Sequence, residues 1–436
     1  MSVFIIVMNV VVLVGIVFYL YKKSTIDALK PFFFPALLLK LLCGVLLGVL
    51  YFSYYGEGDT ILYYTKALLG ADILYQGSLQ PYLKYLFLDE VPRNSLLAAI
   101  QVPYYSSAWN MIKLVSIPLA LTNGNYYLCA LYLSAFSFAG AWFLVQKLSV
   151  YFPGTAKAAA AAFLFFPSVV FWSSGVIKES FIMGGMGLLV GSFLVLRQPD
   201  AGRKKIRYAF FALIGILLIW YVKYFVAIAL GAFLMFAVIL KYIQTSKMLS
   251  GVGAYWKGAM LVVLFAGIAF AVSRLNYNLN FQQLPLTVYD NYLKYTLTAG
   301  DKPSINLPSL KPAYYSFVLH APLAFTYMLF RPFVWEIYNT LTFVAAIENL
   351  LVLMLTILFC KDAISGKVNI SQNNAYLLLV TICYILLMGT LLAYSMPNLG
   401  TLSRYKVVFL PFLIYLLFLS PSNYRYLSRF NIKESI

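Results

Sequence analysis

Two acidic residues separated by one glycine follow an early apolar run in a chain that carries only 14 acidic residues among 436. They are Glu57 and Asp59, in the stretch YYGEGDTILYY. Glycines on either side of Glu57 permit a tight turn and a close approach of a ligand to the backbone. A carboxylate held where water meets lipid is a candidate general base. We therefore predict that Asp59 or Glu57 is catalytic; the alternative is that Asp59 only caps a helix beginning at Thr60.

A second cluster opens a later apolar segment. Lys178 and Glu179 follow Trp172 and the small polar turn Ser-Ser-Gly. Sequence neighbours do not share a helix face, so we expect Lys178 and Glu179 to have different partners. A lysine at an outer membrane edge runs against the positive-inside bias, which favours an anionic ligand; the alternative is snorkelling. Lys223, between two apolar runs, adds a second outer cation.

Two arginines are candidates for phosphate binding. Arg331 opens the aromatic turn RPFVWE, which contains Trp335 and ends at Glu336. Its guanidinium could hold a phosphate with two nitrogens, or it could pair with Glu336 and fix the turn. Arg404 and Tyr405 precede the last apolar run. We expect Arg404 at a helix N-terminus, where the dipole favours an anion.

Composition places these residues in a membrane protein. The chain is 62% hydrophobic and 11% charged, and its formal charge is +18. The basic residues lie in short loops between apolar runs, which indicates topology signals and attraction to anionic lipid rather than nucleic-acid binding. The four cysteines form no CxxC pair and suggest no metal site or disulfide framework. No cofactor is indicated, and a requirement for a divalent metal stays open.

The apolar runs predict an all-α, polytopic fold with about 11–12 membrane spans. Residues 1–436 read as a single integral membrane domain with two outer loops, 54–112 and 274–313, of which the first carries short amphipathic stretches. Segment 314–334 either crosses the membrane or forms a re-entrant element; His320 and two prolines fit a broken segment that lines a cavity. The expected spans are 2–21, 33–53, 126–147, 157–173, 180–197, 207–222, 224–241, 257–273, 342–360, 375–395 and 405–420.

The basic loops also predict orientation. They follow the first, fifth and seventh expected spans and close the chain. The positive-inside rule therefore places them in the cytoplasm and the N-terminus outside. An outer face with carboxylates and several phosphate-sized cations suggests transfer chemistry on a lipid-linked phosphate, in which an acid deprotonates a hydroxyl and cations stabilise the departing phosphate.

This pattern resembles the GT-C superfamily of polytopic glycosyltransferases. Gly58-Asp59 stands where these enzymes place an acid, in the first large outer loop, and Arg404-Tyr405 with Pro411 is similar to their "RY…P" late span. FWSSGVIKES and RPFVWE are similar to segments of bacterial membrane glycosyltransferases. Two features depart from the pattern. The acids are separated by a glycine, and the large loop follows the second span.

The resemblance implies an enzyme of the bacterial inner membrane with its active site facing the periplasm. It would move a sugar from a polyprenyl-phosphate-linked donor to a glycan, lipid or protein acceptor. One alternative is an O-antigen-type polysaccharide polymerase or ligase, which would depend on Arg331 and Arg404. The other is a lipid-linked glycan transporter or flippase, which would need ionisable groups within spans. Glu348 is the only clear acidic candidate for such a group.

Overall fold

The computed structural model describes most of the chain. All named elements in the described part are helices, and two short segments there meet in an isolated β-bridge, Ser304 with Asn398. The predicted all-α class is therefore confirmed. The described residues are 3–76, 79–92, 102–103, 106–198, 204–246, 280–299, 303–368 and 375–428, with isolated residues 96, 202, 253, 263, 267, 270, 273 and 274.

The described residues divide into two compact units, the first extending to Ala227 and the second beginning at Ile228. The boundary falls inside one helix, α10, and each unit is described by itself. The first unit contains α1 (Val3–Lys22), α2 (Lys30–Val49), α3 (Asp59–Tyr75), α4 (Leu79–Leu88), α5 (Ser107–Leu121), α6 (Tyr126–Tyr151), α7 (Ala156–Ala160), α8 (Pro167–Trp172), α9 (Lys178–Leu196) and the first part of α10 (Lys204–Thr245).

Small residues bring the long helices of the first unit together. Gly140 of α6 faces Gly184 and Gly187 of α9, and a Cβ at Gly187 would lie 2.0 Å from the Gly140 carbonyl oxygen. Gly184 and Gly187 of α9 are therefore helix-packing residues. At the start of α6, Gly48 of α2 packs against the ring of Tyr126.

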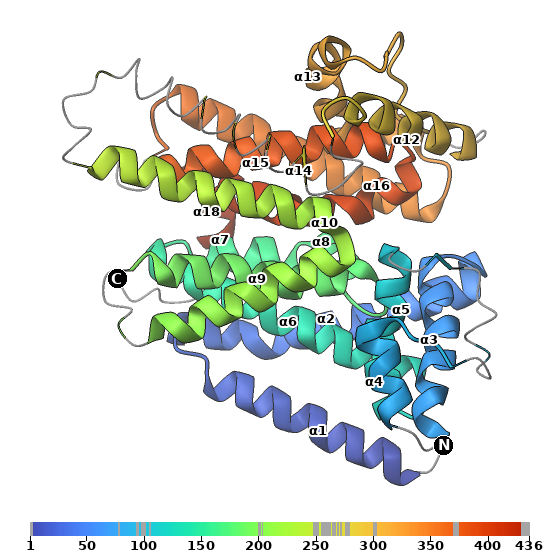
Figure 1. Ribbon diagram of the computed structural model, residues 1–436. Helices are drawn as coiled ribbons and strands as arrows, with labels where there is room; N and C mark the ends of the chain where they lie inside the picture. The colour runs from blue at the N-terminus through green and yellow to red at the C-terminus, as the bar shows by residue number, and fades with distance from the viewer. Residues whose placement is uncertain are drawn as a thin grey trace. The chain divides into compact units, whose positions relative to one another are not determined.

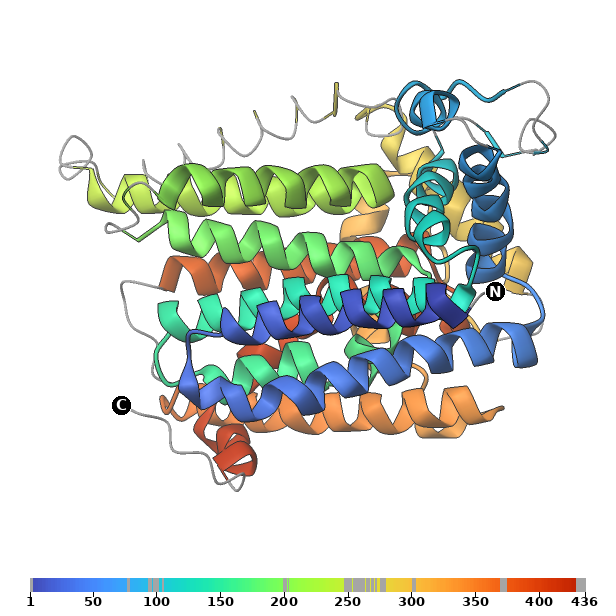
Figure 2. The same cartoon turned by 90° about the horizontal axis from the view of Figure 1, so that it is seen from below.

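The segment between the second and sixth helices forms a separate layer. Helices α3, α4 and α5 run across the direction of α2, α6 and α9 at one end of these helices (Figures 1 and 2). Tyr82 and Tyr85 of α4 pack with Trp109 of α5 in one buried aromatic cluster. The predicted loop 54–112 is therefore largely helical where it is described.

The second unit contains the remainder of α10 and a set of helices joined by short turns. Its helices are α12 (Leu284–Ala299), α13 (Tyr314–Phe330), α14 (Thr340–Ile364), α15 (Ala375–Ser395), α16 (Leu399–Tyr405), α17 (Leu410–Leu417) and α18 (Pro421–Ser428). Helix α13 packs on α15, where the Tyr394 hydroxyl donates to the Phe317 carbonyl and Gly389 meets the Phe325 ring.

Within the described residues, seven helices are long and apolar enough to cross a membrane, or up to eight if one bent pair is a single span. Six predicted spans, beginning at 2, 33, 126, 180, 342 and 375, fall on such helices. The predicted span 157–173 is instead broken into α7, a π-helical turn (Ala161–Phe165) and α8. The predicted spans 207–222 and 224–241 both fall on α10, in which two helical stretches meet at a kink at Lys223. The predicted span 257–273 lies almost wholly outside the described residues.

Candidate active site

The predicted acidic pair lies at the start of α3. Gly56 and Gly58 have φ values of 69° and 118°, in the region that favours glycine. Gly58 occupies the N-cap position, so Asp59 is the first residue of α3 and not its cap. Asp59 is half-buried in the first turn, where the helix dipole favours a negative charge, whereas Glu57 is exposed. The two candidate bases therefore have different surroundings.

Lys178, one of the predicted cations, contacts α3 through Tyr63, one turn beyond Asp59. Residues four apart share a helix face, so Asp59 and Tyr63 are neighbours along α3. The ammonium of Lys178 lies 5.5 Å from the centroid of the buried Tyr63 ring. It also donates to the Ser107 hydroxyl at the start of α5, over 2.8 Å. Three elements, α3, α5 and α9, thus meet around Lys178.

Glu179 and Lys223 form a buried ion pair. The Lys223 ammonium lies 2.6 Å from a carboxylate oxygen of Glu179, and Glu179 is fully buried. Lys223 has non-helical φ and ψ of −147° and 83°, at a break within α10. The predicted break between spans at Lys223 and the different partners of Lys178 and Glu179 are confirmed. Lys223 is not an exposed cation available to a ligand, because its charge is buried and paired with Glu179.

A buried lysine missed by the sequence analysis supports the turn that leads to Lys178. Lys40, in the middle of α2, donates to the Ser173 hydroxyl and to the Val170 carbonyl, the latter over 3.5 Å. These groups lie at the C-terminal end of α8, beside Trp172, which is itself largely buried. A lysine inside the apolar run 33–53 was the signal that could have identified it.

A second group that the sequence analysis missed lies between the end of α4 and α5. One carboxylate oxygen of Asp89 accepts from the Trp109 indole and from the Lys113 ammonium, each over 2.6 Å. Asp89 has a φ of 58°, which is uncommon for a residue other than glycine. The Lys113 ammonium also lies 5.3 Å from the centroid of the Tyr221 ring in α10. This network joins the end of α4 to α5 and α10.

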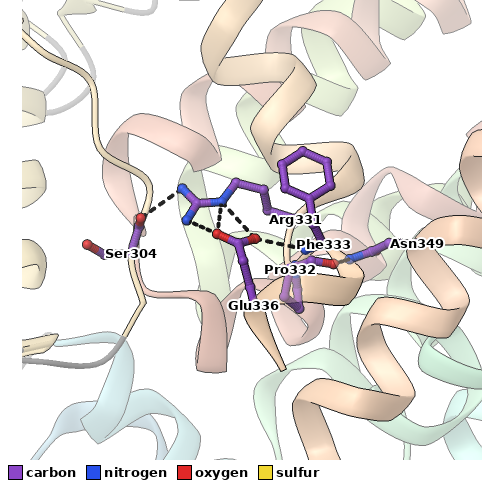
Figure 3. Close-up of polar contacts among 6 residues, drawn as sticks. All are labelled: Ser304, Arg331, Pro332, Phe333, Glu336 and Asn349. Carbon is purple, nitrogen blue, oxygen red and sulfur yellow. Dashed lines mark hydrogen bonds and ion pairs between the residues drawn. The ribbon is translucent and has the colours of Figure 1, made fainter. Parts of the chain in front are cut away.

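The predicted arginine site of the second unit is an internal ion pair (Figure 3). Nε of Arg331 donates to both carboxylate oxygens of Glu336, over 2.9 and 3.1 Å, and Nη2 also contacts Glu336. Nη1 donates to the Ser304 carbonyl over 2.8 Å. Burial would raise the pKa of Glu336, but hydrogen bonds from Arg331 and the Phe333 amide, with the guanidinium charge, hold it below its ordinary value. The alternative of a turn-fixing pair is therefore the observed arrangement.

Arg404 does not lie at a helix N-terminus, so that prediction is wrong. It is in the last turn of the seven-residue helix α16, which begins after an Asn398 cap. A cation is favoured at this end of a helix. Arg404 is buried with its guanidinium 5.3 Å from the Tyr405 ring centroid. The short α16 and α17 enclose a 69° bend, which is why the final span does not begin at residue 405 as expected.

The remaining predicted residues of this unit have separate environments. Trp335 is 80% exposed and stacks on Phe333 at 4.8 Å. Both ring nitrogens of His320 lie within hydrogen-bond distance of backbone carbonyls, those of Ser316 and Pro308. Lys406, which was not predicted, is buried and donates to the Asn349 side chain over 2.9 Å and to the Leu329 carbonyl over 3.0 Å.

Comparisons with known proteins do not assign the chain to a family. No protein-family model matches the chain, and no curated protein or solved structure was found to be similar. In the described part of the chain, no group of three or more histidine, cysteine, aspartate or glutamate side chains is placed to hold a metal ion. The GT-C resemblance therefore rests on the quoted motifs.

Proposed function

We propose that the protein is a membrane glycosyltransferase that moves a sugar from a polyprenyl-phosphate-linked donor to an acceptor hydroxyl, with Asp59 as the general base. The observation that carries this proposal is the meeting of α3, α5 and α9. Asp59 begins α3, half-buried, one turn from the Tyr63 ring that the ammonium of Lys178 faces. A carboxylate and a cation near a membrane-facing bundle suit transfer from a lipid phosphate.

In the proposed step, the acceptor oxygen forms a bond to the anomeric carbon of the sugar. The bond between that carbon and the phosphate oxygen breaks, and its electron pair leaves with the phosphate. Asp59 takes the hydroxyl proton, and Lys178 stabilises the charge that develops on the phosphate. The Glu179–Lys223 pair holds the start of α9 against α10, so it positions Lys178 rather than touching the substrate.

The test is transfer of a radiolabelled hexose from a short-chain polyprenyl-phosphate hexose to acceptors in membranes that contain the protein. Loss of a general base typically lowers the rate by about 10²–10⁴. Asp59→Asn is expected to show such a loss while the protein stays folded. The matched control is Asp72→Asn, a half-buried carboxylate on the same helix. Glu57→Gln should be milder. Near-parental transfer by Asp59→Asn at equal expression would remove Asp59 from the mechanism.

One observation favours a second candidate, a transporter of lipid-linked glycans. Lys40 places an ionisable group in the middle of a helix that is long and apolar enough to span a membrane. Such groups are rare in spans and are commonly functional. A transporter would flip a fluorescent polyprenyl-phosphate lipid in vesicles without transferring sugar, and Asp59→Asn would leave that activity intact. The polymerase or ligase alternative gains less support, because Arg331 already holds Glu336.

A further inference from the structure

Helix α4 presents an apolar face that the described residues of its own unit do not cover. Leu79, Leu83 and Phe87 recur at every fourth residue and are 60%, 43% and 77% exposed. Gln80, Lys84 and Leu88 form the adjacent row, and the two rows line an open hollow. Residues of the opposite face, Tyr82 and Tyr85, are buried against Trp109. The exposed face is therefore a stable feature of a well-anchored helix.

The position of α4 indicates what surrounds this face. Helix α4 lies across the direction of α2 and α6, at one end of these helices (Figures 1 and 2). Both α2 and α6 are long and apolar enough to cross a membrane. A helix crossing them at their end lies roughly parallel to the membrane plane if they span the bilayer.

Tyrosines mark the same end of the bundle. The rings of Tyr64, Tyr126 and Tyr127 are in contact beside the end of α6, and Tyr51 contacts Tyr55 at the end of the π-helical turn after α2. Tyrosine is enriched where hydrocarbon meets head groups. The Tyr75 hydroxyl donates to the Leu119 carbonyl and so joins α3 to α5 within this layer. The layer that holds α4 thus lies at the level of a membrane interface.

We infer that α4 is an interfacial helix whose exposed face binds the phospholipid bilayer. Leu79, Leu83 and Phe87 would enter the boundary between head groups and acyl chains, at a depth of about 5–10 Å. Lys84 borders this face, where its ammonium can contact lipid phosphate. Its ion pair with Glu90 is solvent-exposed and so holds it only weakly. Anionic lipid in the leaflet would favour this contact with the Lys84 ammonium.

The experiment measures depth along α4 in the full-length protein in vesicles of phosphatidylethanolamine and phosphatidylglycerol. A cysteine-depleted chain receives one nitroxide label, at 83, at 87, or at 57 as an exposed control outside α4. Collision rates with oxygen, which partitions into lipid, are compared with those of a water-soluble nickel chelate. We expect oxygen collisions to dominate at 83 and 87 and nickel collisions at 57.

Two results would overturn the inference. Dominant nickel collisions at both 83 and 87 would show that the face is in water. Dipolar broadening between labels at 83 would show that a second copy of the chain covers the face.

A third arm tests the charge: Lys84→Gln should reduce the difference in depth between vesicles with and without phosphatidylglycerol, whereas Lys66→Gln, on α3, should not. None of these measurements needs a sugar donor, so they stand apart from the proposed transfer activity.

Discussion

The guanidinium of Arg331 is held by Glu336 and by the Ser304 carbonyl, so its main role within the second unit is to fix a turn. The carboxylate of Glu336 also accepts from the Phe333 amide over 2.8 Å. These hydrogen bonds join the end of α13 to the segment around Ser304, which forms a β-bridge with Asn398. A phosphate at Arg331 would have to compete with a carboxylate already in place.

This pair predicts a pH-dependent contribution to stability. The folded-state pKa of Glu336 lies below its ordinary value, so the contribution is fully present above the unfolded pKa, about 4.3, and is lost as pH falls through the folded pKa. The variant Glu336→Gln should therefore unfold at a lower temperature than the parent near neutral pH, and the difference should shrink in acid. Thermal unfolding followed by tryptophan fluorescence in detergent measures it.

The control for this prediction is Asp290→Asn, which changes an exposed carboxylate on α12 of the same unit. It should show little difference from the parent, because exposed substitutions usually change stability by less than about 0.5 kcal/mol. Equal unfolding temperatures for Glu336→Gln and the parent at neutral pH would show that the pair contributes nothing measurable.

Sequence reasoning reached some residues of the sites and missed others for identifiable reasons. The divergence of Lys178 and Glu179 followed from helix geometry. The Arg331–Glu336 pair was the alternative to the predicted phosphate binding by Arg331. Lys40 was missed because its partners are a hydroxyl and a carbonyl more than a hundred residues away. The position of Arg404 in its helix was predicted wrongly, because the helix N-cap at Asn398 and the bend after α16 cannot be deduced from an apolar run alone.

At the scale of helices, each unit has a buried lysine whose ammonium lies at the C-terminal end of another helix. Lys40 donates to the Val170 carbonyl and Ser173 at the end of α8, and Lys406 donates to the Leu329 carbonyl at the end of α13. The last carbonyls of a helix have no partner within it, and leaving them unpaired in an apolar interior is costly. A cation also complements the dipole at that end.

We predict that Lys40→Met and Lys406→Met each lower the free energy of unfolding by roughly 1.5–3 kcal/mol, the scale of a hydrogen bond to a charged group. Methionine keeps the length of the side chain while removing the donors. The measurement is denaturant unfolding in detergent, with Lys361→Met as control because Lys361 is exposed on α14. Variants as stable as the control would show that water or local rearrangement can replace the ammonium.

The helices themselves were easier to predict than their interruptions. Long apolar runs identified α2, α6, α9, α14 and α15, since a run of that length has few alternatives to a helix. The expected span 157–173 failed because Pro167 cannot continue a preceding helix and the following Ser-Ser-Gly turn is stabilised by distant groups. The Gly175 amide, for example, donates to the Ser134 hydroxyl of α6 over 2.9 Å.

At the scale of the whole chain, the excess of basic residues is the feature from which we predict orientation. The formal charge is +18; Lys22 is the last residue of α1 and Lys23 follows it directly. The positive-inside rule then places residue 23 in the cytoplasm and the turn at Glu57, beyond the next apolar helix, outside. The sequence predicts this topology, and labelling at the two ends of one membrane-length helix tests it.

The last prediction therefore concerns the two ends of one helix. The apolar helical stretch from Asp27 to Tyr55 contains 29 residues, which at about 1.5 Å each exceed the roughly 30 Å of a bilayer core. Lys23 and Glu57 lie just beyond its two ends, and both are exposed. In a cysteine-depleted chain, a cysteine at 57 should react with a membrane-impermeant maleimide in intact spheroplasts, whereas a cysteine at 23 should react only after lysis. The 29-residue length requires the two sites to differ if this helix crosses the membrane, and the basic loops decide which one faces out.

Labelling of both sites before lysis would show that the helix does not span. Labelling of 23 alone would show that it spans in the opposite orientation, and Asp59 would then face the cytoplasm, away from a periplasmic donor.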